Sequence, residues 1–430
     1  MSHYVDFNHA LVDYILKAYD YIIAGAGAAG LSLAYRLASS SLKDSSVLLL
    51  DRDAKDSNDR TWCFWAAESG PFEHIVFKKW PALKFSEERG SYGGSLGSLE
   101  YKMIRGQDFY REVRQKLKAF TNFEFRQERI QGIEDTASGA VVRTDQEAYF
   151  APVVFNSCLF PESVEKAVPP HFLWQHFAGW RIQTEEPMFK TDEGLLMDFR
   201  TPQYGSARFF YVLPLSEREA LVEYTIFSSE KLQPGYYQQA LATYLQQQWQ
   251  LRPEAYRIAE HEAGAIPMTD QRMPARYGRH TINIGTMAGA VKPTTGYAFK
   301  NIQRQADQLI QQMEQGLPLN AQLKAPQRFR FYDRLLLNIL QHFGEEGKTV
   351  FCRLFRYNRM SAILSFLEER THLLQEVRIF ATLPIITFLR AVGRVYLMPV
   401  VRKLWPESRA SDWMPPRKAP LPLKENQKLL

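Results

Sequence analysis

The chain has 430 residues, of which 45% are hydrophobic and 23% charged, so it is not disordered and has enough length for two or three domains. Lys and Arg total 53 against 47 Asp and Glu, and the net charge of +6 suits an anionic cofactor or membrane surface as well as nucleic acid. The three cysteines and nine histidines show no metal-binding spacing, so we expect neither a disulfide framework nor a bound metal. No basic segment precedes an apolar run near the N-terminus, which predicts a protein that stays on the cytoplasmic side.

The first predicted unit is a strand, a helix and a second strand. Residues 19–24 form an extended β-rich run, apolar residues then recur at helical spacing as far as residue 38, and residues 47–50 are continuously apolar. A continuous apolar run is typical of a strand that is buried on both faces of a parallel sheet. The pattern therefore predicts a βαβ unit of about the usual length.

A glycine-rich turn joins the first strand to the helix with the spacing of a dinucleotide-binding fingerprint. Gly25, Gly27 and Gly30 enclose Ala28 and Ala29 in a G-x-G-x-x-G motif. In this motif the glycines allow a tight turn, the approach of a pyrophosphate and close helix–strand packing. We expect these five residues to bind a cofactor.

An acidic residue closes the second strand, where the fingerprint places the group that binds a ribose hydroxyl. Asp51 follows Gly30 by 21 residues, and its neighbours Arg52 and Asp53 are alternatives for the same task. An acid at this position disfavours a 2′-phosphate, so NADP is the less favoured occupant while FAD and NAD remain open. The competing interpretation is a glycine-rich turn that binds nothing.

The middle of the chain predicts an antiparallel sheet and the last third predicts helices. Residues 86–98 are rich in Gly and Ser and predict a surface loop. Further strands are expected at 140–142, 152–155, 195–199, 208–215, 220–227 and 281–285. Residues 216–219 have the length of a hairpin turn. Helices are expected at 234–252, 302–313, 333–343, 350–355 and 361–369.

A second cofactor signal lies far downstream of the first. Residues 282–289 predict a strand that ends at Gly285, followed by a turn rich in Pro and Gly and then a helix. Such a corner presents backbone amides to a flavin or its phosphates. Two-dinucleotide FAD enzymes usually carry Asp after the glycine, whereas Thr286 stands here. The two signals together indicate FAD, and we assign to it Gly285, Thr286, Pro293, Thr295 and Gly296.

These elements predict an α/β fold with a discontinuous FAD-binding, Rossmann-like domain of the two-dinucleotide hydroxylase type. An antiparallel substrate domain is inserted in it, and a helical C-terminal part follows. The expected boundaries are FAD-binding domain 1–85, 100–165 and 275–310, loop 86–99, substrate domain 166–274, helical region 311–405 and tail 406–430.

The stretch R-T-W-C-F-W from Arg60 to Trp65 resembles that of bacterial lycopene β-cyclases, as do residues 285–289 running into 292–297. Gly179-Trp180 and residues 197–199 also resemble motifs of this family, and the matching motifs occur in the same order along the chain as in the family. The resemblance implies an FAD protein that closes the ψ-ends of lycopene into β-ionone rings, first to γ-carotene and then to β-carotene, without net redox change. It implies reduced FAD with NADPH or NADH as reductant, and we add Arg52 and Arg60 to the cofactor-binding residues.

The resemblance places a catalytic acid at Glu223, in the family's acidic motif. Tyr224 stands where a second acid is usual, so this motif lacks the second carboxylate that a relay of two would need. Strand alternation puts Glu223 on one face with Leu221 and Phe227, where burial would raise its pKa toward that of a general acid. The alternative is a glutamate on the solvent face of the sheet.

Aromatic residues are abundant enough to line a channel and stabilise a carbocation, although core packing explains most of them better. This set comprises Trp62, Phe64, Trp65, Trp174, Phe177, Trp180, Phe209, Phe210 and Tyr211.

The segment 383–405 is the most apolar of the chain, but two arginines and two prolines interrupt it, so it is a poor membrane span. We expect it to lie in the membrane interface, with a core helix as the alternative. The implied partners are a lipid-dissolved carotenoid, the inner membrane surface and other carotenoid enzymes, with no nucleic acid. Rival functions on the same fold are an FAD-dependent monooxygenase, a polyprenyl reductase, and a non-catalytic flavoprotein or carotenoid carrier.

Overall fold

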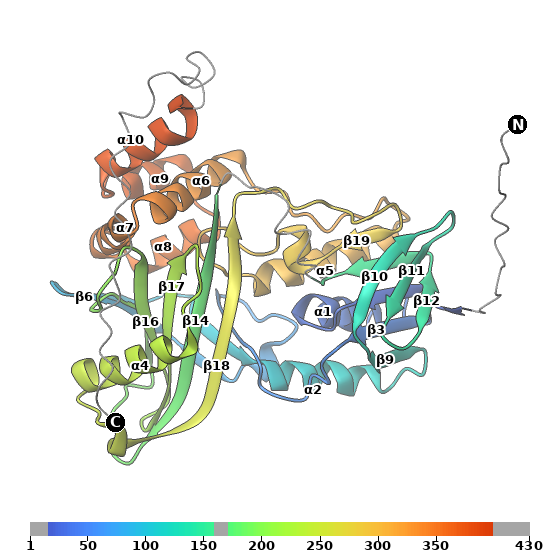
Figure 1. Cartoon of the computed structure of the whole chain (residues 1–430), viewed down its shortest axis with the longest axis horizontal. Coiled ribbons are helices and arrows are strands. Elements are labelled where there is room, and N and C mark those ends of the chain that lie inside the picture. The colour runs from blue at the N-terminus through green and yellow to red at the C-terminus, as the bar shows by residue number, and fades with distance from the viewer. Residues whose placement is uncertain (1–15, 159–170, 399–430) are drawn as a thin grey trace, which may run out of the picture.

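The computed structural model describes residues 16–158 and 171–398 (Figure 1). One half of the molecule is built on a five-stranded parallel sheet, which contains the predicted βαβ unit. In spatial order its strands are β19 (Thr281–Asn283), β13 (Val153–Asn156), β2 (Tyr21–Ala24), β3 (Val47–Asp51) and β9 (Phe123–Gln127). The apolar runs of β2 and β3 are buried throughout the sheet interior, as their composition predicts.

Two layers enclose the parallel sheet. On one face α1 (Ala28–Leu37) packs between α2 (Gly106–Leu117) and α5 (Phe299–Glu314). The opposite face is covered by a second sheet, with which it shares a buried cluster that includes Ile22, Leu48 and Val142. The strands of this second sheet are β1 (Lys17–Ala18), β12 (Ala148–Ala151), β11 (Ala140–Thr144) and β10 (Ile130–Asp135).

The other half is built on a seven-stranded sheet. Its strands are antiparallel except for one parallel pair, and they run in the order β18 (Tyr256–Thr269), β14 (Phe172–Thr184), β17 (Glu219–Ser228), β16 (Ala207–Ser216), β15 (Glu193–Asp198), β6 (Ala82–Glu87) and β7 (Gly90–Ser95). The predicted hairpin is the turn between β16 and β17. A small sheet, β4 (Thr61–Ala66), β8 (Glu100–Arg105) and β5 (Lys78–Trp80), links the two halves.

The segment 86–99 was expected to be a loop, and the structure corrects this expectation. Residues of this segment form strand β7, which pairs with β6 at the edge of the seven-stranded sheet. Gly93 has φ +139°, and a Cβ there would lie 2.1 Å from the carbonyl oxygen of Leu83. The glycines that predicted a loop instead allow close strand pairing, which a local propensity argument does not anticipate.

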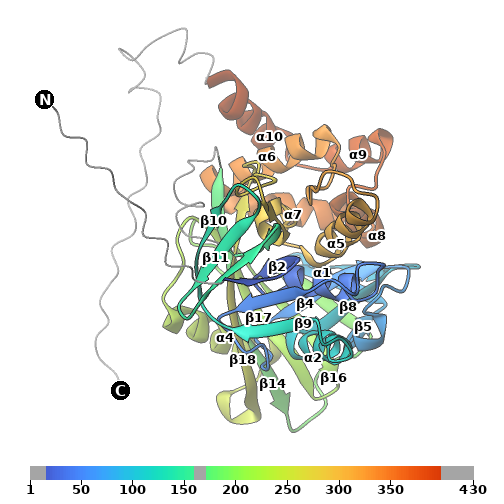
Figure 2. The ribbon, with the colours of Figure 1, turned by 90° about the vertical axis from the view of Figure 1, so that its right-hand side faces the viewer.

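Helices cover both faces of the seven-stranded sheet. One face packs on α4 (Pro234–Trp249), and the other packs on the C-terminal helices α6 (Gln327–His342), α7 (Glu345–Tyr357), α8 (Met360–Leu367), α9 (Leu373–Phe380) and α10 (Ile385–Val392). A π-helical turn, Gly393–Leu397, extends α10. The helices predicted at 234–252, 302–313, 333–343, 350–355 and 361–369 are confirmed, with shifted ends. Figures 1 and 2 show the C-terminal helices gathered at one end of the molecule.

Candidate active site

The glycine-rich turn between β2 and α1 has a different geometry at each glycine. A Cβ at Gly30 would lie 2.0 Å from the carbonyl oxygen of Gly25, so only glycine lets the helix approach the strand here. Gly25 itself has φ +102°, in the left-handed region. A Cβ at Gly27 would meet no atom within 4 Å, so the N-terminal end of α1 is open. This open helix end fits the pyrophosphate of a dinucleotide.

Asp51 lies at the end of β3, next to this turn. Its Oδ2 accepts a hydrogen bond from the backbone N–H of Ala26 at 2.7 Å, and its Oδ1 accepts one from that of Asp53 at 2.9 Å. Oδ1 also lies 3.6 Å from the ammonium of Lys55, whereas Oδ2 has no second partner in the described part of the chain and can still accept a ribose hydroxyl. The side chains of Arg52 and Arg60 are exposed, and Arg52 pairs with Asp53 at 3.5 Å.

The second predicted cofactor segment packs against the first. After β19, a 3-10 turn spans Gly285–Ala288, and a Cβ at Gly285 would lie 2.7 Å from the Cβ of Ala29 at the start of α1. Farther along, Gly296 has φ +73°, and a Cβ there would lie 2.3 Å from Oε1 of Gln175. This Oε1 is a buried acceptor without a hydrogen-bond partner among the described residues. The fold thus brings the two glycine-rich segments together and leaves a buried polar atom beside the second.

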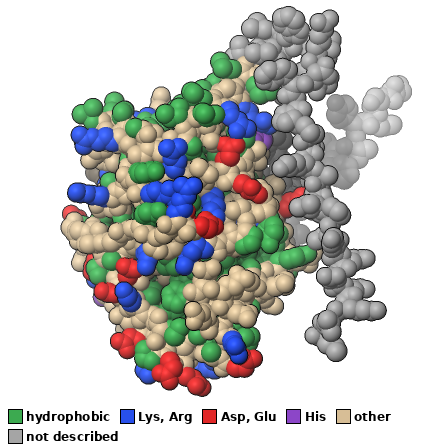
Figure 3. Space-filling model, turned by 90° about the vertical axis from the view of Figure 1, so that its left-hand side faces the viewer, with side chains coloured by type: hydrophobic (Ala, Val, Ile, Leu, Met, Phe, Trp, Pro, Cys, Tyr) green, Lys and Arg blue, Asp and Glu red, His purple; other side chains and the backbone are tan. Residues whose placement is uncertain are grey.

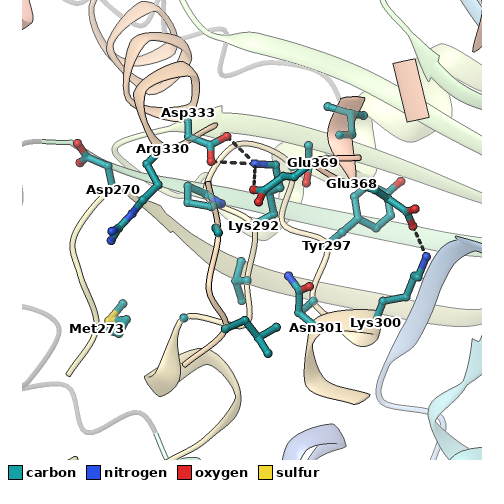
Figure 4. Close-up of a pocket in the computed structure, with 18 of the residues that line it drawn as sticks. Asp270, Met273, Lys292, Tyr297, Lys300, Asn301, Arg330, Asp333, Glu368 and Glu369 are labelled. Atoms are coloured by element: carbon teal, nitrogen blue, oxygen red, sulfur yellow. Dashed lines mark hydrogen bonds and ion pairs between the residues drawn. The ribbon is translucent and has the colours of Figure 1, made fainter. Parts of the chain in front are cut away.

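A cavity of about 600 Å³ opens beside the second segment (Figure 4). Thr286, Pro293 and Thr295 line it, together with residues of α5 and α6. At its wall the ammonium of Lys292 lies 2.8 Å from carboxylate oxygens of both Asp333 and Glu369. Burial lowers the pKa of Lys292, but these carboxylates outweigh it and the net shift is upward. Lys292 therefore stays charged and ties the cofactor segment to the C-terminal helices.

A smaller apolar cavity of about 90 Å³ adjoins the first, with which it shares Trp65, Thr295 and Tyr297. Strands β15, β16 and β17 supply one wall, and the C-terminal helices supply the other. Its aromatic lining residues are Trp65, Tyr211, Phe227, Tyr297, Phe329, Tyr332, Phe351, Phe355, Phe366, Phe380 and Phe388.

Glu223 lies in the middle of β17 on the face that points toward this cavity. Leu221 and Phe227, on the same face, belong to the core under the C-terminal helices, whereas Val222 and Tyr224 pack under α4 on the opposite face. The predicted alternation is therefore confirmed, and the alternative of a glutamate on a solvent-facing sheet is wrong. The pKa of Glu223 is raised to about 8, mainly by burial and then by the charge of Glu262. A hydrogen bond of 2.6 Å from the Thr225 hydroxyl acts in the opposite direction and lowers this pKa.

Three tyrosines and a cysteine lie between Glu223 and the cavities. Tyr211 pairs directly with Glu223 across strands β16 and β17, and its phenol is hydrogen-bonded to that of Tyr297. The hydroxyl of Tyr101 lies 2.9 Å from that of Tyr297. Burial raises the pKa of all three phenols and of the Cys63 thiol, so these groups are neutral. Glu223 thus lies near neutral phenols of two residues that line the apolar cavity, Tyr211 and Tyr297.

The structure adds a residue that sequence reasoning missed. Glu262 on β18 and Glu223 on β17 both pair with Gly179 of the intervening strand β14. Glu262 accepts hydrogen bonds from Thr61, at 3.0 Å from the backbone N–H and 2.7 Å from the hydroxyl. The only sequence signal is the alternation of glutamates in β18, which does not show what lies beside them.

The predicted aromatic set divides between different surroundings. Trp65 and Tyr211 line the apolar cavity. Trp180 and Phe210 pack under α4, on the face away from the cavity. Trp62 and Phe64 stack on Phe299 beside the second cofactor segment, with ring centroids 5.8 and 5.1 Å apart.

Helices α9 and α10 expose a large apolar surface. The exposed fractions of Leu374, Val377, Ile385, Ile386 and Leu389 lie between 60% and 75%, so α10 is not the buried core helix that was the alternative. Figure 3 shows hydrophobic side chains crowded along the top of this face, with Lys and Arg beneath them.

Among the described residues, no single helix is both long and apolar enough to cross a membrane. The helices Leu373–Phe380 and Ile385–Leu397 meet those criteria only together, as a pair bent by 110°. Residues 399–405 of the predicted interfacial segment lie outside the described residues.

Comparison of the fold with solved structures gives the class of protein. The chain superimposes on a flavoprotein/dehydrogenase from Cytophaga hutchinsonii with a TM-score of 0.55 and 12% identity, covering 85% of this chain and 100% of the other. It superimposes on p-nitrophenol 4-monooxygenase from Pseudomonas putida with a TM-score of 0.54 and 12% identity, covering 88% and 100%. The predicted fold class is confirmed: this is the Rossmann-like fold of FAD-dependent monooxygenases and reductases.

The sequence comparisons give the family. The profile described as "Lycopene cyclase protein" matches residues 20–392. The "Lycopene beta-cyclase" of Pantoea ananas is 27% identical over 309 residues, which is 68% of this chain and 74% of the relative. The chain belongs to the lycopene cyclase family, as the resemblance of its motifs indicates.

Proposed function

We propose that this protein is a lycopene β-cyclase that uses reduced FAD, with NADPH or NADH as the reductant. The proposed reaction closes each open ψ-end of lycopene into a β-ionone ring and gives γ-carotene and then β-carotene. A proton adds to the terminal alkene, the ring closes on the resulting cation, and a second proton leaves the ring. Atoms and electrons balance without net oxidation, so substrate and product have the same mass.

The observation that carries the proposal is the place of Glu223, on the face of β17 that points toward an aromatic cavity, where burial raises its pKa. With a pKa of about 8, Glu223 keeps its proton at neutral pH and can donate it as a general acid. The cavity wall next to it consists of Tyr211 and Tyr297. A phenol can accept the proton of Glu223 on its oxygen while it gives its own proton to an alkene in the cavity. The carboxylate of Glu223 is then ready to recover a proton.

The cavity lining suits a carbocation. Aromatic rings present a negative face to a cation, worth about 1–2 kcal/mol for each well-placed desolvated ring. The C-terminal helices close the cavity with apolar side chains, which exclude the water that would otherwise trap the cation as an alcohol. The residues present thus favour ring closure over hydration.

The two glycine-rich segments would hold FAD. Gly27 leaves room for its pyrophosphate at the N-terminus of α1, and Asp51 can accept a ribose hydroxyl. Thr286, Pro293 and Thr295 would surround the flavin end at the larger cavity. When bound in its reduced form, FAD would supply an electron-rich ring system that stabilises the cation or takes part in proton transfer.

A host that accumulates lycopene tests the function. Cells expressing this chain should convert the red pigment to a yellow product of unchanged mass, resolved by chromatography and mass spectrometry. The variant Glu223→Gln, which keeps the side-chain shape but cannot donate a carboxyl proton, should leave lycopene unconverted.

Other outcomes would change the assignment. A product that gains oxygen or two hydrogens would indicate a monooxygenase or a polyprenyl reductase. Unchanged red pigment with a folded, flavin-loaded protein would overturn the cyclase proposal. Conversion that survives Glu223→Gln would keep the cyclase and remove Glu223 as its acid.

We also propose that α9 and α10 attach the protein to the surface of the inner membrane. Their outer faces carry the exposed apolar side chains, and their inner faces supply Phe380 and Phe388 to the apolar cavity. Exposed Arg378 and Arg394 lie beside the apolar residues, where they can meet anionic lipid headgroups. A carotenoid dissolved in the bilayer would then reach the cavity without crossing water.

Flotation with vesicles tests this attachment. The wild-type protein should float with phosphatidylglycerol-containing vesicles more than with pure phosphatidylcholine, and Ile386→Glu should abolish flotation. Leu317→Glu is the matched control, because Leu317 is an exposed leucine in the segment after α5. Equal flotation of Ile386→Glu and Leu317→Glu would contradict the attachment.

A further inference from the structure

The proposed acid has a carboxylate neighbour from a distant part of the chain. Glu223 and Glu262 pair with the same residue, Gly179, from opposite sides of β14. Their Cα atoms are therefore two strand spacings apart, about 10 Å, and both side chains point to the same face of the sheet. Gly179 has no side chain to separate them. A Cβ at Gly179 would already lie 3.4 Å from the Cβ of Glu223.

The two carboxyl groups have different partners. Both oxygens of Glu262 accept hydrogen bonds from Thr61, whose backbone N–H and hydroxyl donate at 3.0 and 2.7 Å. Glu223 accepts one hydrogen bond, from the Thr225 hydroxyl at 2.6 Å. Two acceptor bonds favour the ionised form of Glu262 more strongly than one bond favours that of Glu223.

We propose that Glu262 is a positioning residue for the acid: the two carboxyl groups share one proton across Gly179, and the Thr61 hydrogen bonds leave that proton on Glu223. This inference rests on the proposed function, because a protonated Glu223 is needed only if Glu223 donates a proton to lycopene. The negative charge of an ionised Glu262 disfavours ionisation of Glu223 on the same face of the sheet, so Glu223 keeps its proton at neutral pH. It also gives Thr61, within the R-T-W-C-F-W stretch, a defined task.

Other ionisable groups surround the pair. Glu223 faces Tyr211, Tyr297 and Cys63. Burial raises the pKa of Glu262, and the charge of Arg60 opposes that rise while the charge of Asp59 adds to it. The small pocket beside Glu262 is further lined by charged or titratable Arg105, Arg181, Glu260 and His261. Arg181 and Arg105 are already paired, with Glu260 at 2.7 Å and Asp108 at 2.6 Å respectively.

Infrared difference spectra of the flavin-loaded protein at different pH values measure the pair directly. The carbonyl band of a protonated carboxyl that disappears in Glu223→Gln identifies Glu223, and its midpoint should lie near pH 8 in the wild type. We expect Glu262→Gln to move that midpoint down by about 1–2 pH units, because a neighbouring like charge is lost. The alkaline limit of cyclisation should move down equally, with kcat rather than KM affected.

Matched variants separate this effect from simple loss of structure. Thr61→Val removes the hydroxyl and should lower the midpoint, whereas Thr61→Ser keeps the hydroxyl and should restore it. Glu260→Gln removes a charge two residues along the same strand and should leave the midpoint unchanged. If Glu262→Gln does not fold, the Thr61 variants give the answer.

A midpoint that is unchanged or raised in both Glu262→Gln and Thr61→Val would overturn the proposal. Glu262 would then only tie β18 to β4, and both variants would lower Tm without changing the titration. A lowered midpoint in a protein that never cyclises lycopene would support the pair and overturn the proposed function.

Discussion

The two faces of the seven-stranded sheet are built from the same strands but differ in kind. Under α4 the face is packed and apolar, and Phe210 stacks between Tyr224 and Tyr244 with centroids 4.6 and 3.8 Å apart. On the other face Glu223 and Glu262 stand beside Gly179, which leaves the space between them free. Both faces contain apolar core, but only the second also carries two half-buried carboxyl groups, and the desolvation of Glu223 costs stability.

The difference between the two faces explains why an acid at position 224 could not serve as a second acid beside Glu223. It follows Glu223 in the chain, but strand alternation sends it to the packed face. A carboxylate at position 224 would lie under α4, away from the cavity. The second carboxylate of the proposed pair comes from another strand, because Glu262 on β18 pairs with Gly179 on the same face as Glu223.

The largest expected effect is on kcat, and it should separate Glu223 from Tyr224, which are adjacent in β17 but lie on opposite faces of the sheet. Glu223→Gln should lower kcat for the proposed cyclisation by about 10²–10⁴-fold, because the proposed general acid is lost. Tyr224→Phe should retain near-normal kcat, because it keeps the ring that packs on Phe210. The kcat of each variant is measured as the rate of product formation per flavin-loaded protein molecule. A comparable loss in Tyr224→Phe would mean that the two faces do not differ in function.

The same glutamate should cost stability in a pH-dependent way. The pKa of Glu223 rises from 4.5 in the unfolded chain to about 8 in the folded protein. The folded state therefore binds the extra proton, and the free energy of unfolding falls as pH rises from 4.5 to 8. Glu223→Gln should be more stable than wild type by about 2–4 kcal/mol at pH 8 and by little near pH 5.

Urea unfolding at the two pH values measures this difference. Tyr224→Phe serves as the control, since its effect on stability should not depend on pH in this range. An advantage of Glu223→Gln that is the same at both pH values would contradict a raised pKa in the folded protein.

A smaller effect is expected at the tyrosines between the acid and the cavity. Tyr297→Phe removes the hydroxyl that links Tyr101 and Tyr211, and should lower kcat by about 10–100-fold with little change in KM. Tyr101→Phe should have less effect, because Tyr101 does not line the described cavities. Steady-state kinetics of both variants test the order. Equal rates in wild type and Tyr297→Phe would show that the proton reaches the substrate by another route.

Much of the fold followed from local patterns. The apolar runs and glycine spacing predicted β2, α1 and β3, and alternation placed Glu223 on the same face as Leu221 and Phe227. The loop prediction for 86–99 was wrong. Glycine and serine are poor local strand formers, and only pairing with β6 makes residues 90–95 a strand. At 383–405 composition left an interfacial segment and a core helix as alternatives, because an apolar helix has the same composition in a core as on a surface, and only the structure shows that α10 is exposed.

The sequence by itself determined the dinucleotide-binding turn, the family and the proposed acid, because each depends on residues that are neighbours in the chain. Tertiary structure alone decided what surrounds that acid. Gly179, Glu223 and Glu262 lie tens of residues apart, and only the register of three strands places the two glutamates on either side of the same glycine. The reason is physical: spacing along a strand sets the direction of a side chain, but its neighbours come from other strands, whose register depends on the packing of the whole sheet.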